Sequence, residues 1–224
     1  MKCFLCKYII IITLLCSFPC MPLPADAAPG NGLEKSVAQY GLDIEFYYKN
    51  PRPDILPGML RVLDEKRIFA APDKSMTVSA FLGEIFRKDP RQTNTLDEAA
   101  ANLSPKAQDV VQEGKKMAAL QNGIPRLLCC DMLQDATRIS MCWAAFGASG
   151  DIRFVDAVIE AACDFARRNA AGSAHDLRFR IGQEAARTLF DYARRHPAVM
   201  SRCKELRGKK DPPSAEMLRR VIEG

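Results

Sequence analysis

Residues 142–162 read CWAAFGASGDIRFVDAVIEAA, and this stretch indicates the fold class of the chain. A first apolar segment ends at Gly147, and Asp151 then occupies the N-cap position of a second segment. The apolar residues of the second segment recur at the spacing of one helix face: Phe154, Val155, Val158, Ile159, Ala162 and Phe165. The stretch therefore predicts two helices joined by a short turn, which is the unit of a helical hairpin.

The same helical period continues in both directions along the sequence. Three further stripes are Leu56, Met59, Leu60 and Leu63; Val78, Phe81, Leu82 and Ile85; and Leu177, Ile181, Ala185, Leu189 and Tyr192. A helix is expected between Ser75 and the Asp89-Pro90 step, and Ser104-Pro105 indicates the start of another. His196-Pro197 predicts the end of the longest helix. We expect an all-α fold of about seven or eight helices, stacked as hairpins in a solenoid-like or irregular bundle.

The segment before the first stripe is different in composition. Residues 37–48, VAQYGLDIEFYY, contain aromatic and branched residues without a helical stripe, so extended backbone is predicted there. A strand in this segment would lack a second strand for pairing. The prolines of 47–60, YYKNPRPDILPGML, mark the start of the first helix, because proline is tolerated in a first turn. The expected organisation is an extended N-terminal arm over 28–52 and a single helical domain over 53–224.

Tyr47, Tyr48 and Arg52 are the candidate binding residues of the sequence. Aromatic residues beside an arginine are common in recognition patches. Aromatic residues are more common in cores, and in that interpretation the tyrosines fix the arm onto the helices. Adjacent residues in extended backbone point to opposite sides, so the two tyrosines are expected to differ in burial.

Three glycines lie inside predicted helices, where glycine is less favourable than alanine by about 0.5–1 kcal/mol. They are Gly58, Gly83 and Gly182. We expect close helix crossings at these positions.

Two resemblances add to the residue patterns. One stretch resembles a tetratricopeptide repeat through Trp143, Gly147, Gly150-Asp151, Ala157 and Ala161. It departs from that pattern because Ala157 follows Gly150 at a longer spacing. Residues 54–90 and 151–197 also form two helix-pair units, which are unequal in length. The mature chain is also similar to uncharacterised secreted bacterial helical proteins that share a Tyr-Tyr-x-Asn-Pro-x-Pro start and a phenylalanine-containing step ending in Asp/Asn-Pro. The first resemblance implies stacked helical repeats, and the second implies no known activity.

The N-terminus has the regions of a secretory signal peptide. Lys2 and Lys7 precede an apolar run from Tyr8 to Phe18, and Ala25-Asp26-Ala27 supplies an A-x-A cleavage site. The run is about half of the ~20 residues that a membrane-spanning helix needs. Residues 1–27 are therefore predicted to be removed, which places the mature chain in the periplasm or outside the cell. An uncleaved signal sequence is the only membrane attachment expected.

Charge and cysteine content restrict the partners. The formal charge is +5, and loss of two lysines and one aspartate with the signal peptide lowers it by one. Such mild basicity predicts no nucleic-acid binding, and the pairs Arg167-Arg168, Arg194-Arg195 and Arg219-Arg220 are interpreted as solvated helix ends.

Five of the nine cysteines remain in the mature chain: Cys129, Cys130, Cys142, Cys163 and Cys203. They lack the ligand spacing of a zinc site, so no metal or cofactor is predicted. The odd number requires a free thiol or an intermolecular bond, and the chain is expected to contain either buried thiols or one bridge from Cys142 to Cys163.

No motif of an enzyme active site occurs in the sequence, which contains no nucleophile elbow, HExxH or phosphate-binding glycine loop. The function predicted is a non-enzymatic periplasmic or secreted helical module that binds another protein. The alternative is an enzyme acting on a cell-envelope polymer, with a site around His175 or His196 and acidic neighbours. A deep polar pocket at a histidine would favour the enzyme, and an open apolar or aromatic face would favour the binding module.

Overall fold

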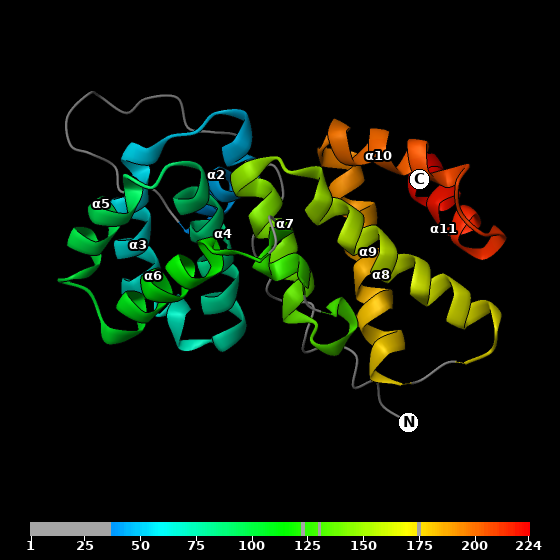
Figure 1. Ribbon diagram of the computed structural model, residues 1–224, viewed down its shortest axis with the longest axis horizontal. Helices are drawn as coiled ribbons and strands as arrows, with labels where there is room; N and C mark the ends of the chain where they lie inside the picture. Colours follow the sequence, from blue (N-terminus) through cyan, green and yellow to red (C-terminus); the bar gives the residue numbers. More distant parts are fainter. Residues whose placement is uncertain (1–36, 122–123, 130, 174–175) are drawn as a thin grey trace, which may run out of the picture.

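The structure is a computed structural model, and it describes residues 37–121, 124–129, 131–173 and 176–224. The predicted signal peptide over 1–27, residues 28–36 of the predicted arm and the candidate His175 lie outside the described residues. Within the described ranges the chain forms ten α-helices (Figure 1), which confirms the all-α prediction with somewhat more helices than expected.

Five helices form the N-terminal half and five the C-terminal half. The first five are α2 (Val37–Phe46), α3 (Leu56–Glu65), α4 (Pro72–Lys88), α5 (Gln92–Ala100) and α6 (Pro105–Ala118). The second five are α7 (Thr137–Ser149), α8 (Ile152–Ala170), α9 (Leu177–Arg195), α10 (Pro197–Arg207) and α11 (Pro212–Glu223). Short 3-10 turns connect them: η1 (Tyr47–Lys49), η2 (Pro53–Ile55), η3 (Ile68–Ala70), η4 (Arg126–Cys129) and η5 (Met132–Gln134). Two-residue strands β1 (Leu120–Gln121) and β2 (Ile124–Pro125) pair antiparallel.

Two clusters of buried apolar side chains hold these halves together, and α7 belongs to both. The N-terminal core is built from α2 to α6, and Ala144 and Ala148 of α7 contribute to it. The C-terminal core is built from α8 to α11, and α7 contributes Cys142, Trp143, Ala145 and Phe146. Every residue from Met141 to Ser149 is buried. Helix α7 therefore lies between the N-terminal core and the C-terminal core (Figure 1), and its segment from Met141 to Ser149 is buried.

The prediction of extended backbone over 37–48 is wrong. Residues 37–46 form helix α2, and residues 47–49 form the turn η1. Val37, Tyr40, Ile44 and Tyr47 all pack on the N-terminal core, and their spacing is that of a helix face. The β-branched and aromatic residues obscured this stripe, because their strand propensity is overridden by tertiary packing.

Four of the described helices, α6, α8, α9 and α11, begin at a residue whose side chain caps them. The side chain of Ser104 accepts a hydrogen bond from Ala107 N, and that of Asp151 accepts one from Arg153 N. Helix α4 begins at Pro72, three residues before the predicted Ser75, with proline in its first turn. Helix α7 continues to Ser149, and Gly150 adopts the left-handed conformation (φ 68°) that commonly ends a helix.

Close helix crossings are confirmed at two of the three glycines. A Cβ built on Gly182 of α9 would lie 2.8 Å from Phe165 Cβ on α8, and one on Gly83 of α4 would lie 2.9 Å from Met117 Cβ on α6. A Cβ on Gly58 would instead lie 3.0 Å from the hydroxyl of Tyr40. Only a very small residue permits the first two approaches.

The two units that looked alike in the sequence are packed differently. Helices α8 and α9 pack against each other, whereas α4 packs mainly against α6 and α7. Within the described ranges, none of the helices combines the length and the apolar character that crossing a membrane requires.

Candidate functional site

A buried polar cluster joins helix α2 and turn η1 to the junction of α9 and α10. It consists of Glu45, Tyr48, Arg195 and His196. Arg195 Nη1 donates to Glu45 Oε2 at 2.6 Å, and His196 Nε2 lies 2.9 Å from Glu45 Oε1. The hydroxyl of Tyr48 lies 3.1 Å from His196 Nδ1. Both nitrogens are satisfied when Nε2 carries the proton and donates to Glu45, while Nδ1 accepts from the tyrosine.

Aromatic rings enclose the imidazole of His196. The ring of Phe46 stacks on it with centroids 4.6 Å apart, and the ring of Tyr192 stacks at 5.2 Å. Phe146 of α7 meets it edge-on at 5.5 Å. The side chain of His196 is fully buried, and that of Glu45 is 9% exposed. The cluster therefore contains a fully buried histidine and a nearly buried carboxylate, and the guanidinium that completes the ion pair is partly exposed.

The local sequence places each member of this cluster. Pro197 follows His196, so His196 takes an extended conformation (φ −121°, ψ 103°) and helix α9 ends at Arg195. Glu45 lies on the buried side of α2, one residue before Phe46. The prediction that Arg194-Arg195 is a solvated helix end is wrong for Arg195, because its guanidinium is paired with Glu45.

The adjacent tyrosines of η1 point into different cores. Tyr47 is 6% exposed and meets Phe81 of the N-terminal core edge-on at 5.4 Å. Tyr48 is half-buried and packs on Phe146 of the C-terminal core at 5.0 Å. Both tyrosines thus have packing contacts, and Tyr48 also has a polar contact with His196.

The order tyrosine, histidine, glutamate has the arrangement of a nucleophile, a base and an orienting carboxylate. Two features oppose that role here. Burial raises the pKa of Tyr48, and the charge of Glu45 raises it further, so the phenol is held in its neutral form. His196 is fully buried and both of its ring nitrogens are in hydrogen bonds, so it cannot reach a substrate proton. The arrangement fits a structural connection better than catalysis.

A shallow recess lies beside the cluster and opens to the surface. We call it the α2 recess; it encloses about 280 Å³ and is lined by Leu42, Asp43, Phe46, Tyr47, Asn50, Arg52 and Ile55. Leu42 is one of the lining residues and is 45% exposed; the other exposed leucines of the described residues are Leu120 and Leu177. Arg52 Nη2 donates to Asp54 Oδ2 at 3.1 Å, and both groups are exposed.

The structure thus separates the three sequence-predicted binding residues. Tyr47 and Arg52 line the recess, whereas Tyr48 belongs to the polar cluster with His196. Leu42, Phe46 and Glu45 were not among the candidate residues of the sequence. If residues 37–47 are treated as a helix, Leu42 falls on the face opposite the buried stripe. That position is the sequence signal that could have identified Leu42 as an exposed apolar residue.

A second recess of about 340 Å³ lies between α4, α6, η4 and α7. Its apolar lining consists of Met76, Met117, Leu127 and Met141. The charged residues of the lining are Asp73, Glu113, Arg126, Asp135 and Arg138. Methionine is a flexible residue that fills irregular spaces in cores as well as binding surfaces. Within the described ranges, no group of three or more histidine, cysteine, aspartate and glutamate side chains has an arrangement that could hold a metal ion.

No protein-family model, no curated protein and no solved structure matches this chain.

Proposed function

We propose that this protein is a non-enzymatic helical module, exported through its N-terminal signal peptide, that binds another protein at the α2 recess. The observation that carries the proposal is that exposed Leu42 lines a recess whose two aromatic lining residues are held in place. These two residues, which we call the floor of the recess, are Phe46 and Tyr47. Phe46 stacks on His196, and Tyr47 meets Phe81 edge-on. A pre-ordered aromatic floor lowers the conformational entropy lost on binding.

The size and lining of the recess favour a protein as the ligand. At about 280 Å³ it lies at the lower limit of small-molecule pockets, which are about 300–1,000 Å³ and enclose most of their ligand. An open recess of this size instead suits one apolar anchor side chain of a partner. Asn50 and Arg52 would then lie at the polar rim, where they fix orientation more than affinity.

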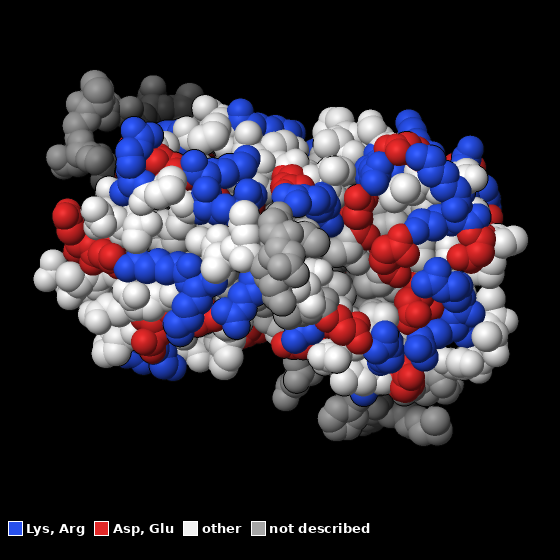
Figure 2. Space-filling view, in the orientation of Figure 1, with Lys and Arg blue, Asp and Glu red and all other residues white. Residues whose placement is uncertain are grey.

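The surface charges favour a protein over a nucleic acid. Over the α8 to α11 half of the face in Figure 2, basic and acidic side chains alternate. Many are paired within one helix, such as Arg187 with Glu184 and Arg219 with Glu216. On this half of that face, paired charges give no continuous basic surface for a phosphate backbone.

An enzyme acting on a cell-envelope polymer is less well supported. His196 is enclosed by rings and hydrogen bonds, and the pKa of the neighbouring tyrosine is shifted away from reactivity. His175, the other histidine considered for such a site, lies outside the described residues.

Site-specific crosslinking in the native host tests the proposal. A photoreactive amino acid replaces Leu42 in one variant and Leu177, 55% exposed at the start of α9, in the matched control. We expect one discrete crosslinked protein from position 42 and none from position 177.

Leu42→Asp should abolish co-purification of that protein, whereas Leu177→Asp should not. Because both positions are exposed, each substitution should leave the free energy of unfolding within about 0.5 kcal/mol of the wild type. Equal crosslinking from both positions would reject the recess as the binding site.

A further inference from the structure

The recess between α4, α6, η4 and α7, which we call the methionine recess, gathers several methionines of the chain. Two of the nine methionines, Met1 and Met21, belong to the predicted signal peptide, and seven follow it. Three of these seven line the recess: Met76 from α4, Met117 from α6 and Met141 from α7. Met76 and Met117 are half-buried, whereas Met141 is 6% exposed. Two thioether side chains of the recess are therefore partly open to solvent.

The methionine recess admits water and small polar solutes. It opens to the surface, and its volume of about 340 Å³ has room for several water molecules, each of which occupies ~30 Å³ in the liquid. Its lining combines the thioethers with charged side chains, among them Asp73 and Arg138. Charged groups keep water around them. A solute similar to water in size and polarity, such as hydrogen peroxide, can therefore approach the half-buried sulfur atoms.

The other four methionines that follow the signal peptide are packed in or against the cores. Met59 is 1% exposed in the N-terminal core, and Met132 is 8% exposed in the C-terminal core. Met200 and Met217 are partly buried and pack against the C-terminal core. The two half-buried methionines of the recess belong to neither core. A solute reaches a core sulfur only through a local opening of the fold, and such an opening costs free energy.

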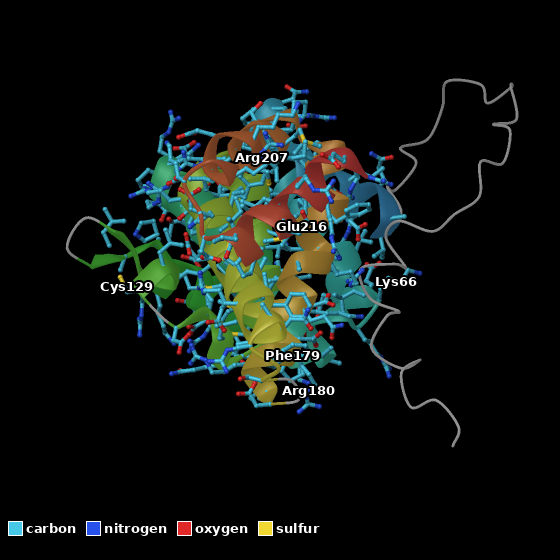
Figure 3. All side chains as sticks on the ribbon, turned by 90° about the vertical axis from the view of Figure 1, so that its right-hand side faces the viewer. Lys66, Cys129, Phe179, Arg180, Arg207 and Glu216 are labelled. Carbon is cyan, nitrogen blue, oxygen red and sulfur yellow. The ribbon has the colours of Figure 1, made fainter. Side chains whose placement is uncertain are left out.

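The buried thiols do not compete for an oxidant. Cys142, Cys163 and Cys203 are free thiols without exposed surface, which is the first of the two alternatives that the sequence left open. Burial raises the pKa of Cys203 to about 12, and only the thiolate form is strongly reactive. Cys129 is exposed at the surface on η4 (Figure 3), so its thiol must be blocked before methionine oxidation is measured.

We propose that the methionine recess is a modification site, at which hydrogen peroxide converts Met76 and Met117 to methionine sulfoxides. The thioether sulfur attacks one peroxide oxygen, the O–O bond breaks, and the other oxygen leaves as water after it takes up a proton. The sulfur loses two electrons and the peroxide gains them. A methionine sulfoxide reductase reverses the change, because a dithiol is oxidised to a disulfide and the oxygen leaves as water. Each oxidation replaces an apolar group of the lining by a polar one.

Limited oxidation of the folded mature chain tests this site. Accessible cysteines are blocked with N-ethylmaleimide, hydrogen peroxide is added, and oxygen uptake at each methionine is followed over time by peptide mass spectrometry. The same treatment in urea gives the unprotected rate of each methionine. Relative to that rate, we expect Met76 and Met117 to react at least about tenfold faster than Met59 and Met132, which react only when a core opens.

Leucine variants separate the recess from general oxidation. Met76→Leu combined with Met117→Leu conserves side-chain volume and removes both sulfurs, so it should abolish the fast oxygen uptake. The matched control, Met200→Leu combined with Met217→Leu, removes two partly buried methionines at the C-terminal core and should retain it. Oxidation of Met200 and Met217 as fast as that of Met76 and Met117, or equal protection of all seven methionines, would overturn the inference. Loss of the helical circular-dichroism signal before the recess methionines react would also overturn it, because oxidation would then report unfolding.

Discussion

Replacing Glu45 by alanine should destabilise the fold more than any other single change in the polar cluster. The carboxylate accepts from Arg195 at 2.6 Å and from His196 at 2.9 Å, and its side chain is 9% exposed. The alanine variant leaves the fully buried Nε2 of His196 without its acceptor. Removing one partner of a buried charged pair is strongly unfavourable, because the remaining group stays desolvated.

The magnitude follows from the two bonds that are lost. Hydrogen bonds to charged groups contribute about 1.5–3 kcal/mol each. The bond from His196 counts in full, since that ring is completely buried. The bond from Arg195 counts for less, because its side chain is 28% exposed and Nε still donates to Asp191 O. We therefore expect a loss of about 3 kcal/mol in the free energy of unfolding.

Glu45→Gln separates charge from hydrogen bonding. The amide oxygen can still accept from Arg195, and the amide N–H can donate to Nε2 if the proton of His196 moves to Nδ1. The loss should then be about 1 kcal/mol.

Urea unfolding followed by circular dichroism measures each change, with Asp54→Ala as a control that breaks an exposed ion pair and should cost less than about 0.5 kcal/mol. A loss below about 1 kcal/mol in the alanine variant would refute the reasoning.

Three further changes test the packing and the surface charges. Gly182→Leu should lower the urea midpoint by an amount equivalent to about 1–3 kcal/mol, because Phe165 leaves no space for a side chain; a higher midpoint would contradict the crossing. Tyr47→Ala should cost about 3 kcal/mol by the same assay, since the side chain is 6% exposed in the N-terminal core. Hydrogen bonding from Arg219 lowers the pKa of Glu216 to about 2, so its contribution to stability is present above pH 4.5 and is lost as the pH falls toward 2. A carbon NMR titration should show this pKa rising in Arg219→Ala.

The fold class could be predicted because it depends on local signals. The stripe of α8 and the capping Asp151 both lie within one short segment, so no knowledge of distant contacts is needed to recognise them. The close crossing at Gly182 was predictable for a related reason, since a glycine inside a helix requires a cause. Helix α2 was missed because its residues favour strands in isolation and become helical against the N-terminal core.

The polar cluster could not be predicted in the same way. Glu45 and His196 are 151 residues apart in the sequence, and neither has a neighbour that marks it as buried. Proline after His196 indicated only a helix end. Which carboxylate satisfies a buried histidine is decided by how the two halves pack on α7, and a single sequence does not contain that information.

The position of Phe46 connects the cluster to the proposed binding surface. One face of its ring stacks on His196, and the residue also lines the α2 recess. Its neighbour Tyr47 lines the same recess and packs into the N-terminal core. The recess floor therefore rests on both cores at once, and its shape depends on how they meet. A substitution inside the buried cluster, such as Glu45→Ala, should for that reason weaken binding at the recess even though Glu45 does not line it.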